Sequence, residues 1–357
     1  MFFYISLFLF LIFSILQCPK NKKIGIFWII FLCFLSMFRA ESVGTDTANY
    51  TDYSSKISKF VIDYDGDFQI GRMLEISYLS TVMWLYENDY SPRLLICLMS
   101  IITFLFLFLS LKRMNLSYGI GVLTFMIVFY LASFNIARQI CACSIILYSY
   151  TFLFEKNSKK YLFFLFIILA TTFHASSILY LSMYIFRYIN TDIFKKTTLT
   201  YIAISLFIIN IIYPLPLSEW LTSTFSSLSY AETYSANSVT QSRSIFGILY
   251  SFIQFLPYII IFVKCNKEKL NIQDIIFYLS IISLILSSTA NSDFARIFLP
   301  LQVFQILYIT NLYAEKRLKL NKAPFYYFIA LNTLLVLYGA STGSGEVVPY
   351  IIDFKFN

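Results

Sequence analysis

Residues 93–111 read RLLICLMSIITFLFLFLSL, and two cations, Lys112 and Arg113, follow at once. As a helix, an apolar run of this length can cross a hydrocarbon core of about 30 Å. Comparable runs recur along all 357 residues, of which 59% are hydrophobic and 13% charged, with a mean hydropathy of +0.72. A soluble core cannot absorb so much apolar surface, and the runs are continuous rather than alternating, which argues against a transmembrane barrel. The sequence therefore predicts an all-α polytopic membrane protein.

The apolar runs predict about 12 transmembrane helices in a single membrane domain, residues 1–357. The first run has no basic residue before it and no small-x-small site before Lys20, so we expect it to be a span rather than a signal peptide. The expected spans are 2–17, 24–38, 93–111, 118–134, 137–154, 161–175, 176–190, 198–213, 245–263, 272–289, 297–312 and 324–340.

The cations predict the orientation of these spans. Every second connection is basic, which is the positive-inside pattern and leaves both termini outside. The basic connections follow the first, third, fifth, seventh, ninth and eleventh spans, with Lys22, Lys112, Lys159, Lys195, Lys267 and Lys319 among their residues. The net charge of +8 therefore indicates topology and contact with anionic lipid, not with nucleic acid.

Residues 68–86 are semi-apolar, but they cannot be a span without inverting every later connection. We therefore expect an outer-surface or re-entrant helix there. It belongs to the first of two long outer loops, 39–92 and 214–244, which are expected to contribute to a site for a polar ligand. No pair of the six cysteines lies in these outer loops, so the sequence suggests neither a disulfide nor a thiolate metal site.

Several arginines map to the predicted outer face, where the orientation bias disfavours them. Arginine is a permanently charged, forked donor suited to phosphate, so this placement favours an anionic ligand bound from outside. The alternative is that these side chains reach the lipid headgroups or pair with outer carboxylates such as Glu41 or Asp293. The arginines are Arg39, Arg72, Arg138, Arg243 and Arg296.

His174 is the only histidine. Its ordinary pKa near 6.5 suits a general base at neutral pH. Glu75 and Asp46 are rival bases, because a carboxylate can do the same work if burial raises its pKa. The structural alternative is a histidine that packs a turn between two helices.

Five short motifs occur in an order and spacing that resemble the EpsG/Wzy-type polysaccharide polymerase family. Each motif alone is weak, and beyond Arg296 the resemblance is only one of hydropathy. In chain order they are Arg39 with Val43-Gly44-Thr45-Asp46-Thr47-x-x-Tyr50, Glu75-x-x-Tyr78, Asn135-x-x-Arg138-Gln139, Phe173-His174-x-Ser176, and Arg296.

The resemblance implies an integral-membrane glycosyltransferase of the bacterial inner membrane whose active site faces the periplasm. Such enzymes transfer a growing glycan from undecaprenyl pyrophosphate to another lipid-linked repeat unit, and they make O-antigen, capsule or exopolysaccharide. Direct attack by the acceptor inverts the anomeric centre and needs no metal or other cofactor. A chain-length regulator is the expected protein partner.

The resemblance also implies roles for individual residues. His174 is the expected base, with Glu75 second and Asp46 a further catalytic candidate. Arg138 and Arg296 are expected to stabilise the leaving pyrophosphate, because its charge grows as the glycosidic bond breaks. The remaining expected contacts to pyrophosphate or substrate are Arg39, Arg72, Asn135, Gln139 and Tyr50.

The main alternative function is a flippase or exporter of lipid-linked glycans. A transporter of this kind is expected to carry polar residues near the membrane midplane and to consist of two related halves. In this chain the charges gather at one predicted face and the halves do not resemble each other. A membrane acyltransferase is a third reading, since it also needs a histidine.

Overall fold

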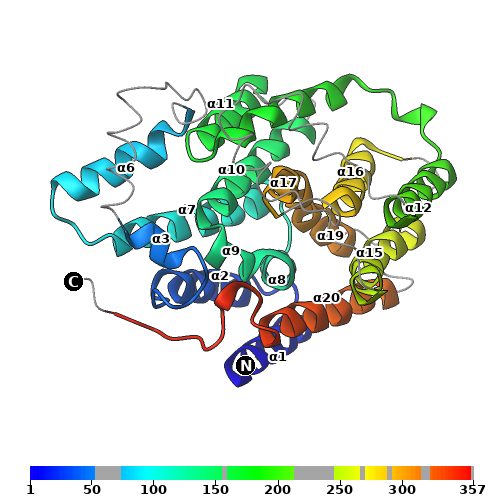
Figure 1. Ribbon diagram of the computed structural model, residues 1–357. Coiled ribbons are helices and arrows are strands. Elements are labelled where there is room, and N and C mark those ends of the chain that lie inside the picture. Colours follow the sequence, from blue (N-terminus) through cyan, green and yellow to red (C-terminus); the bar gives the residue numbers. More distant parts are fainter. Residues whose placement is uncertain are drawn as a thin grey trace. The chain divides into compact units, whose positions relative to one another are not determined.

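The computed structural model of the chain is helical throughout the part that it describes, which comprises residues 1–52, 74–154, 159–212, 245–265, 270–287, 292–314 and 322–354 (Figure 1). The described residues form no strand, although Arg39 and Ile352 make an isolated antiparallel bridge. The chain divides into two compact units: residues 1–181 with 332–357, and residues 182–331. The single-domain organisation expected from the sequence stays a prediction.

The first unit contains the N-terminal helices. They are α1 (Phe2–Gln17), α2 (Lys22–Met37), α3 (Thr47–Thr51), α6 (Ile76–Glu87), α7 (Arg93–Arg113), α8 (Tyr118–Phe125), η1 (Met126–Tyr130), α9 (Ala132–Asn135), α10 (Ala137–Phe154) and α11 (Lys160–Thr171). The short turn η5 (Ser344–Glu346) also belongs to this unit, while η2 (Ala175–Tyr188) begins in it.

The second unit is also helical. Its helix α16 (Ile272–Ser287) packs against α12 (Lys196–Ile212), α15 (Ile245–Cys265), α17 (Ser292–Ile297), α18 (Leu299–Gln302) and α19 (Phe304–Ala314). The remaining elements are η3 (Thr191–Ile193) and α20 (Ala323–Ser341), and the latter runs on from this unit into the first.

Each apolar run of the sequence corresponds to helix in the structure. Within the part of the chain that the structure describes, four helical stretches are long and apolar enough to cross a membrane: 93–113, 137–154, 295–314 and 323–341. Six further apolar helices among the same residues have 10–17 residues each. The all-helical membrane fold is therefore confirmed, while the number of about 12 spans stays a prediction.

Polar caps fix where two of these helices begin. Asn21 accepts hydrogen bonds from the backbone amides of Lys23 and Ile24 at the start of α2, and Ser117 accepts one from Ile120 at the start of α8. Such caps satisfy amides that have no partner within the helix. Both caps follow basic residues, so each new helix starts directly after a predicted inner connection.

The core of the first unit surrounds α10. This helix packs along α7 and α11, while α2 packs along α7 and α8. Most of the side chains of α10 are buried, and Cys141, Ile145, Ile146 and Tyr150 are almost completely so. A helix covered on so many sides is held rigidly, and its first turn carries Arg138.

Two predicted segments differ in detail from the structure. The helix that starts at 160 ends at Thr171, and residues 175–188 form a 3₁₀ helix rather than an α-helix. Arg296 lies within α17, not in a connection between helices. Of the predicted outer or re-entrant helix at 68–86, residues 68–73 lie outside the described part, and α6 accounts for the rest.

Candidate active site

A break between two helices positions the Asn135-x-x-Arg138-Gln139 motif. The rod formed by α8, η1 and α9 contains one π-helical stretch, Met126–Tyr130, and ends at Asn135. Ile136 leaves the helical conformation with φ −114° and ψ 47°, and α10 starts at the next residue. Asn135 therefore closes one helix while Arg138 lies in the first turn of the next.

The N-terminus of α6 packs against the C-terminus of α11. The backbone amides of Ser77 and Tyr78 donate to the carbonyl oxygen of Thr172 over 3.1 Å and 3.2 Å. In return, the amide of Ala175 donates to Oε1 of Glu75 over 3.0 Å. The start of one helix thus supplies donors to the end of the other, and Glu75 accepts an amide at the start of η2.

Glu75 joins the two cations of the predicted site. Nη1 of Arg138 lies 2.6 Å from Oε2 of Glu75, and Nδ1 of His174 lies 3.3 Å from Oε1. The Arg138 contact is an ion pair, whereas His174 pairs with Glu75 by charge only when its imidazole is protonated. The side chain of Glu75 is 4% exposed, whereas those of Arg138 and His174 are 27% and 22% exposed. Of these three side chains, those of Arg138 and His174 are the ones that can reach a ligand.

The surroundings of Glu75 favour its charged form. Burial by itself raises the pKa of this carboxyl, but His174, Arg138 and the Ala175 amide outweigh burial and hold the pKa below its ordinary value. Glu75 is therefore ionised at neutral pH. A carboxylate held in this way is a weak base and a strong orienting partner for both cations.

Tyr50 lies on the short helix α3 next to Arg138, and Asp46 lies just before this helix. Tyr50 is 9% exposed, and burial raises the pKa of its hydroxyl. Asp46 raises this pKa further, while the charge of Arg138 and a hydrogen bond from its backbone amide act against the rise. Asp46 precedes α3 and makes no side-chain cap. Arg138 and Asp46 therefore both act on the phenol of Tyr50.

The loop before α3 is pinned to the end of α9. Oδ1 of Asn135 accepts a hydrogen bond of 2.8 Å from the amide of Thr45 and lies 3.3 Å from the Thr45 hydroxyl. Gly44 has φ +93°, and a Cβ there would lie 2.7 Å from the carbonyl oxygen of Phe134. Only glycine fits that position, since it needs both the conformation and the close approach.

Arg39 lies beneath this loop rather than at the surface. It is 1% exposed, and its Nε donates to the Thr47 hydroxyl over 3.1 Å while Nη1 donates to the Ser36 carbonyl over 2.7 Å. Its guanidinium carbon lies 5.1 Å from the centre of the Phe134 ring. Burial lowers the pKa of Arg39 to about 10, so the residue remains charged at neutral pH.

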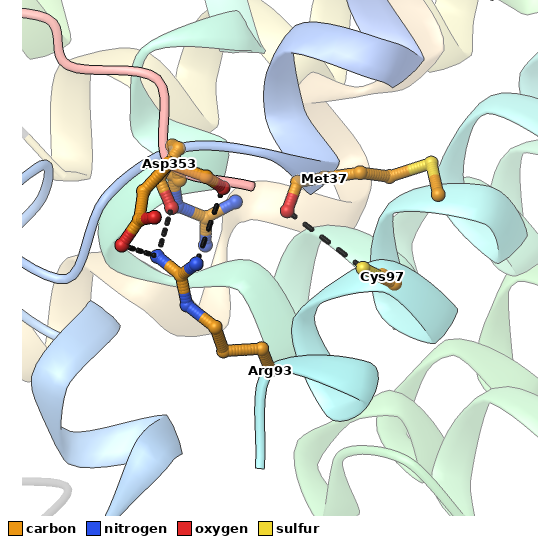
Figure 2. Close-up of polar contacts among 5 residues, drawn as sticks. Met37, Arg93, Cys97 and Asp353 are labelled. Carbon is orange, nitrogen blue, oxygen red and sulfur yellow. Dashed lines mark hydrogen bonds and ion pairs between the residues drawn. The ribbon is translucent and has the colours of Figure 1, made fainter. Parts of the chain in front are cut away.

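The C-terminal segment covers the end of α2. Ala40 donates to the carbonyl of Ile351, and the amide of Asp353 donates to the carbonyl of Phe38. Figure 2 shows Arg93 reaching from α7 to Asp353, with Nη2 3.0 Å from the carboxylate oxygen Oδ2. The same Nη2 lies 3.4 Å from the carbonyl oxygen of Arg39. The C-terminal segment and the segment that follows α2 thus meet at Arg39.

A sequence model of the EpsG family matches residues 22–352, a stretch that contains all of the site residues predicted from the sequence. The chain belongs to the EpsG family. Searches of the curated proteins and of the solved structures found no significant match. Membership of the EpsG family, together with the apolar helices, indicates a membrane protein of polysaccharide biosynthesis and, in general terms, a polymerase of the glycosyltransferase kind.

The structure brings most of the EpsG-family site residues predicted from the sequence into the first unit. Glu75, Arg138 and His174 form one cluster, with Tyr50 and Asp46 beside it. Three other predicted residues of the first unit are buried or engaged with the protein: Asn135 accepts from Thr45, Gln139 is 3% exposed, and Arg39 is buried. Arg296 belongs to the second unit, and Arg72 lies outside the described residues.

Other contributors had no role in the sequence-based prediction. They are the amide of Ala175, the ring of Tyr78, and the Arg93–Asp353 pair. The three-residue spacing of Glu75 and Tyr78 is a signal that could have indicated a shared helix face. Among the residues that the structure describes, no group of three or more His, Cys, Asp and Glu side chains is arranged to hold a metal ion.

Proposed function

We propose that this EpsG-family chain polymerises oligosaccharide repeat units carried on undecaprenyl pyrophosphate into a surface polysaccharide, at the outer face of the bacterial inner membrane. The observation that carries the proposal is the cluster in which one buried carboxylate, Glu75, holds an arginine and the chain's single histidine at the edge of the first unit. A base and a guanidinium side by side are what transfer from a pyrophosphate to a hydroxyl requires.

In this mechanism His174 removes the proton. Its Nδ1 faces Glu75, so Nε2 is turned away from the carboxylate, on the opposite side of the ring. When the Nδ1 proton points at Glu75, Nε2 is the proton acceptor. The acceptor hydroxyl attacks the anomeric carbon, its proton passes to Nε2, and the bond between that carbon and the pyrophosphate oxygen breaks. The anomeric centre is inverted.

Arg138 stabilises the leaving group. Undecaprenyl pyrophosphate departs with the electron pair of the broken bond, and its negative charge grows in the transition state. Because Glu75 binds Arg138 through Nη1, the position of that nitrogen is set before the substrate arrives. Arg296 remains a proposed second donor to the pyrophosphate, while the burial of Arg39 favours a supporting role for that residue.

The partners of the site follow from this chemistry. Donor and acceptor are both lipid-linked glycans that approach from the bilayer, and we keep a chain-length regulator as the proposed protein partner. The second outer loop proposed to line the site, 214–244, lies outside the described residues. A flippase has no need of a base held by a carboxylate, so the Glu75–His174 pair favours the polymerase.

The test is a replacement series in the host strain. Arg138→Lys keeps the charge and loses the fork, and His174→Ala removes the base, so both are expected to abolish most polymerisation while the membranes keep normal amounts of the protein. Single repeat units should then accumulate on the lipid carrier at the outer face. Arg113→Lys is the matched control for the loss of a guanidinium stacked on an aromatic ring, since Arg113 lies over Phe152 at the opposite end of α7 from Arg93, and it should leave polymerisation normal.

Wild-type chain lengths from Arg138→Lys would contradict the assignment of Arg138 to the pyrophosphate.

Accumulation of repeat units at the inner face in a strain that lacks the protein would favour the flippase instead. An added, membrane-impermeant glycosidase distinguishes the two faces, because it reaches only units that have accumulated at the outer face.

A further inference from the structure

The ring of Tyr78 lies against the guanidinium of Arg138. The guanidinium carbon is 4.7 Å from the ring centre, and Tyr78 is 5% exposed. Glu75 is the N-cap residue of α6 and Tyr78 lies in its first turn, three residues later, and both contact Arg138. One turn of helix therefore supplies both a carboxylate and an aromatic face to the same arginine.

These two contacts restrict different motions of Arg138. The hydrogen bond to Glu75 is made through Nη1, and it fixes the position of that nitrogen more firmly than the plane of the guanidinium. An aromatic face attracts a cation and favours a stacked, parallel guanidinium. The carboxylate thus fixes where Nη1 lies, and the ring fixes the plane in which the other nitrogens lie.

The position of the ring is itself fixed relative to His174. The amide of Tyr78 donates to the carbonyl of Thr172 over 3.2 Å, two residues before the histidine. The amide of Ser77 donates to the same oxygen over 3.1 Å. A movement of this turn would displace the support of Arg138 and the backbone next to His174 together.

We propose that Tyr78 is a positioning residue for the transfer reaction: its ring holds the Arg138 guanidinium in the plane from which it meets the pyrophosphate. The inference rests on the proposed function and adds a residue to it. Tyr78 does not touch the substrate, and it acts only through Arg138. The π face is the functional part of the side chain, and the hydroxyl is not required.

Three replacements separate this role from the two simpler ones. Tyr78→Phe keeps the face and loses the hydroxyl, Tyr78→Leu keeps an apolar side chain and loses the face, and Tyr78→Trp keeps a π face on a larger ring. If the residue only fills space, Leu will serve; if its hydroxyl matters, Phe will fail. Tyr86→Leu, at a half-exposed tyrosine on the same helix, is the matched control.

The assay uses the full-length protein in membranes and the lipid-linked repeat units that accumulate in a strain lacking it, with kcat and KM measured separately. Tyr78→Phe and Tyr78→Trp are expected to keep kcat within about twofold, and Tyr78→Leu to lower kcat roughly tenfold with little change in KM, as for a contact that matters most in the transition state. Tyr86→Leu should match the wild type.

A double replacement tests whether the effect passes through Arg138. In the Arg138→Ala background, Tyr78→Leu should cause no further loss of residual turnover, because the group that it positions is gone. The inference would be overturned by an equal loss in both backgrounds, by a full loss in Tyr78→Phe, or by a normal kcat in Tyr78→Leu. In each of these cases the proposed function stands as long as the wild-type protein joins the repeat units. A wild-type protein that does not join the repeat units would overturn both.

Discussion

Glu75 and Arg138 are 63 residues apart in the chain, yet their side chains meet over 2.6 Å, and the carboxylate is almost completely buried. The same carboxylate also faces His174, 99 positions further along the chain than Glu75. One negative charge thus orients two positive or potentially positive groups. Replacing the charge without changing the shape of the side chain separates its electrostatic role from its packing.

Glu75→Gln keeps the size of the side chain and an acceptor for the Ala175 amide, but it leaves Arg138 without its countercharge. We expect turnover to fall by about 10²-fold or more, because the base and the guanidinium lose their common orienting group. Glu87→Gln, at the exposed end of the same helix, is the control. Near-normal turnover in His174→Ala, combined with an inactive Glu75→Gln, would instead assign the base role to the carboxylate.

The depressed pKa of Glu75 makes a contribution to stability that depends on pH. The folded protein holds this carboxyl ionised more firmly than the unfolded chain, whose ordinary value is 4.5. The contribution is therefore complete above that value and is lost progressively as the pH falls below it, through the folded-state pKa. Thermal unfolding of the wild type and of Glu75→Gln in detergent, from neutral pH to about pH 3, measures it. A difference in Tm that widens toward acid would contradict this sign.

Arg39 and Arg138 should respond differently to the same change. Arg39→Lys removes the bond to Thr47 from a fully buried position, so we expect a loss of about 1–3 kcal/mol in the free energy of unfolding and a turnover per folded molecule close to normal. Arg138→Lys should show the reverse, with a normal Tm and little turnover. If Arg39→Lys were stable and inactive, Arg39 would belong among the groups that contact the substrate.

The turn at the C-terminus offers a matched pair of glycines. Gly343 and Gly345 have φ +79° and +73°, but a Cβ on Gly345 would lie 2.1 Å from Nδ2 of Asn135, whereas nothing lies within 4 Å of one on Gly343. Gly343→Ala should cost about 1 kcal/mol from backbone strain alone. Gly345→Ala should cost more and also lower turnover, because it displaces the residue that holds Thr45. Equal effects of the two on Tm and turnover would exclude this coupling.

The predicted orientation can be tested with two exposed positions in a background lacking all six cysteines. Ser42→Cys lies in the predicted outer loop and should react with an impermeant thiol reagent on intact cells. Lys159→Cys lies in a predicted inner connection and should react only after the membrane is opened. The opposite labelling would place the cluster around Glu75 in the cytoplasm.

The helices could be predicted from the sequence because each apolar run is long and bounded by charge or by a capping residue. The segment 137–154 coincides with α10 at both ends, and 2–17 coincides with α1. The 3₁₀ geometry of residues 175–188 could not be predicted in this way, since hydropathy carries the same signal for both helix types.

The membership of the site was partly predictable, but its internal arrangement was not. The sequence presented Glu75 and His174 as rival bases, and the structure pairs them. The sequence assigned Asn135 to the ligand, whereas in the structure the side-chain oxygen of Asn135 accepts a hydrogen bond from Thr45. A contact between Asn135 and a ligand stays a prediction. Which residues meet across about 100 positions is decided by helix packing, and local spacing carries no information about it.

The antiparallel contact between residues 38–40 and 351–353 has a consequence for biosynthesis. Ribosomes add about 5–20 residues per second, so roughly 300 residues, or about 15 s to 1 min of synthesis, separate the two halves of this contact. During that interval Arg93 has no Asp353 to bind, and the amide of Gly44 has no Glu346 carbonyl to meet. A nascent or prematurely terminated chain can therefore insert its helices into the membrane well before the contacts around Arg39 and Gly44 are assembled.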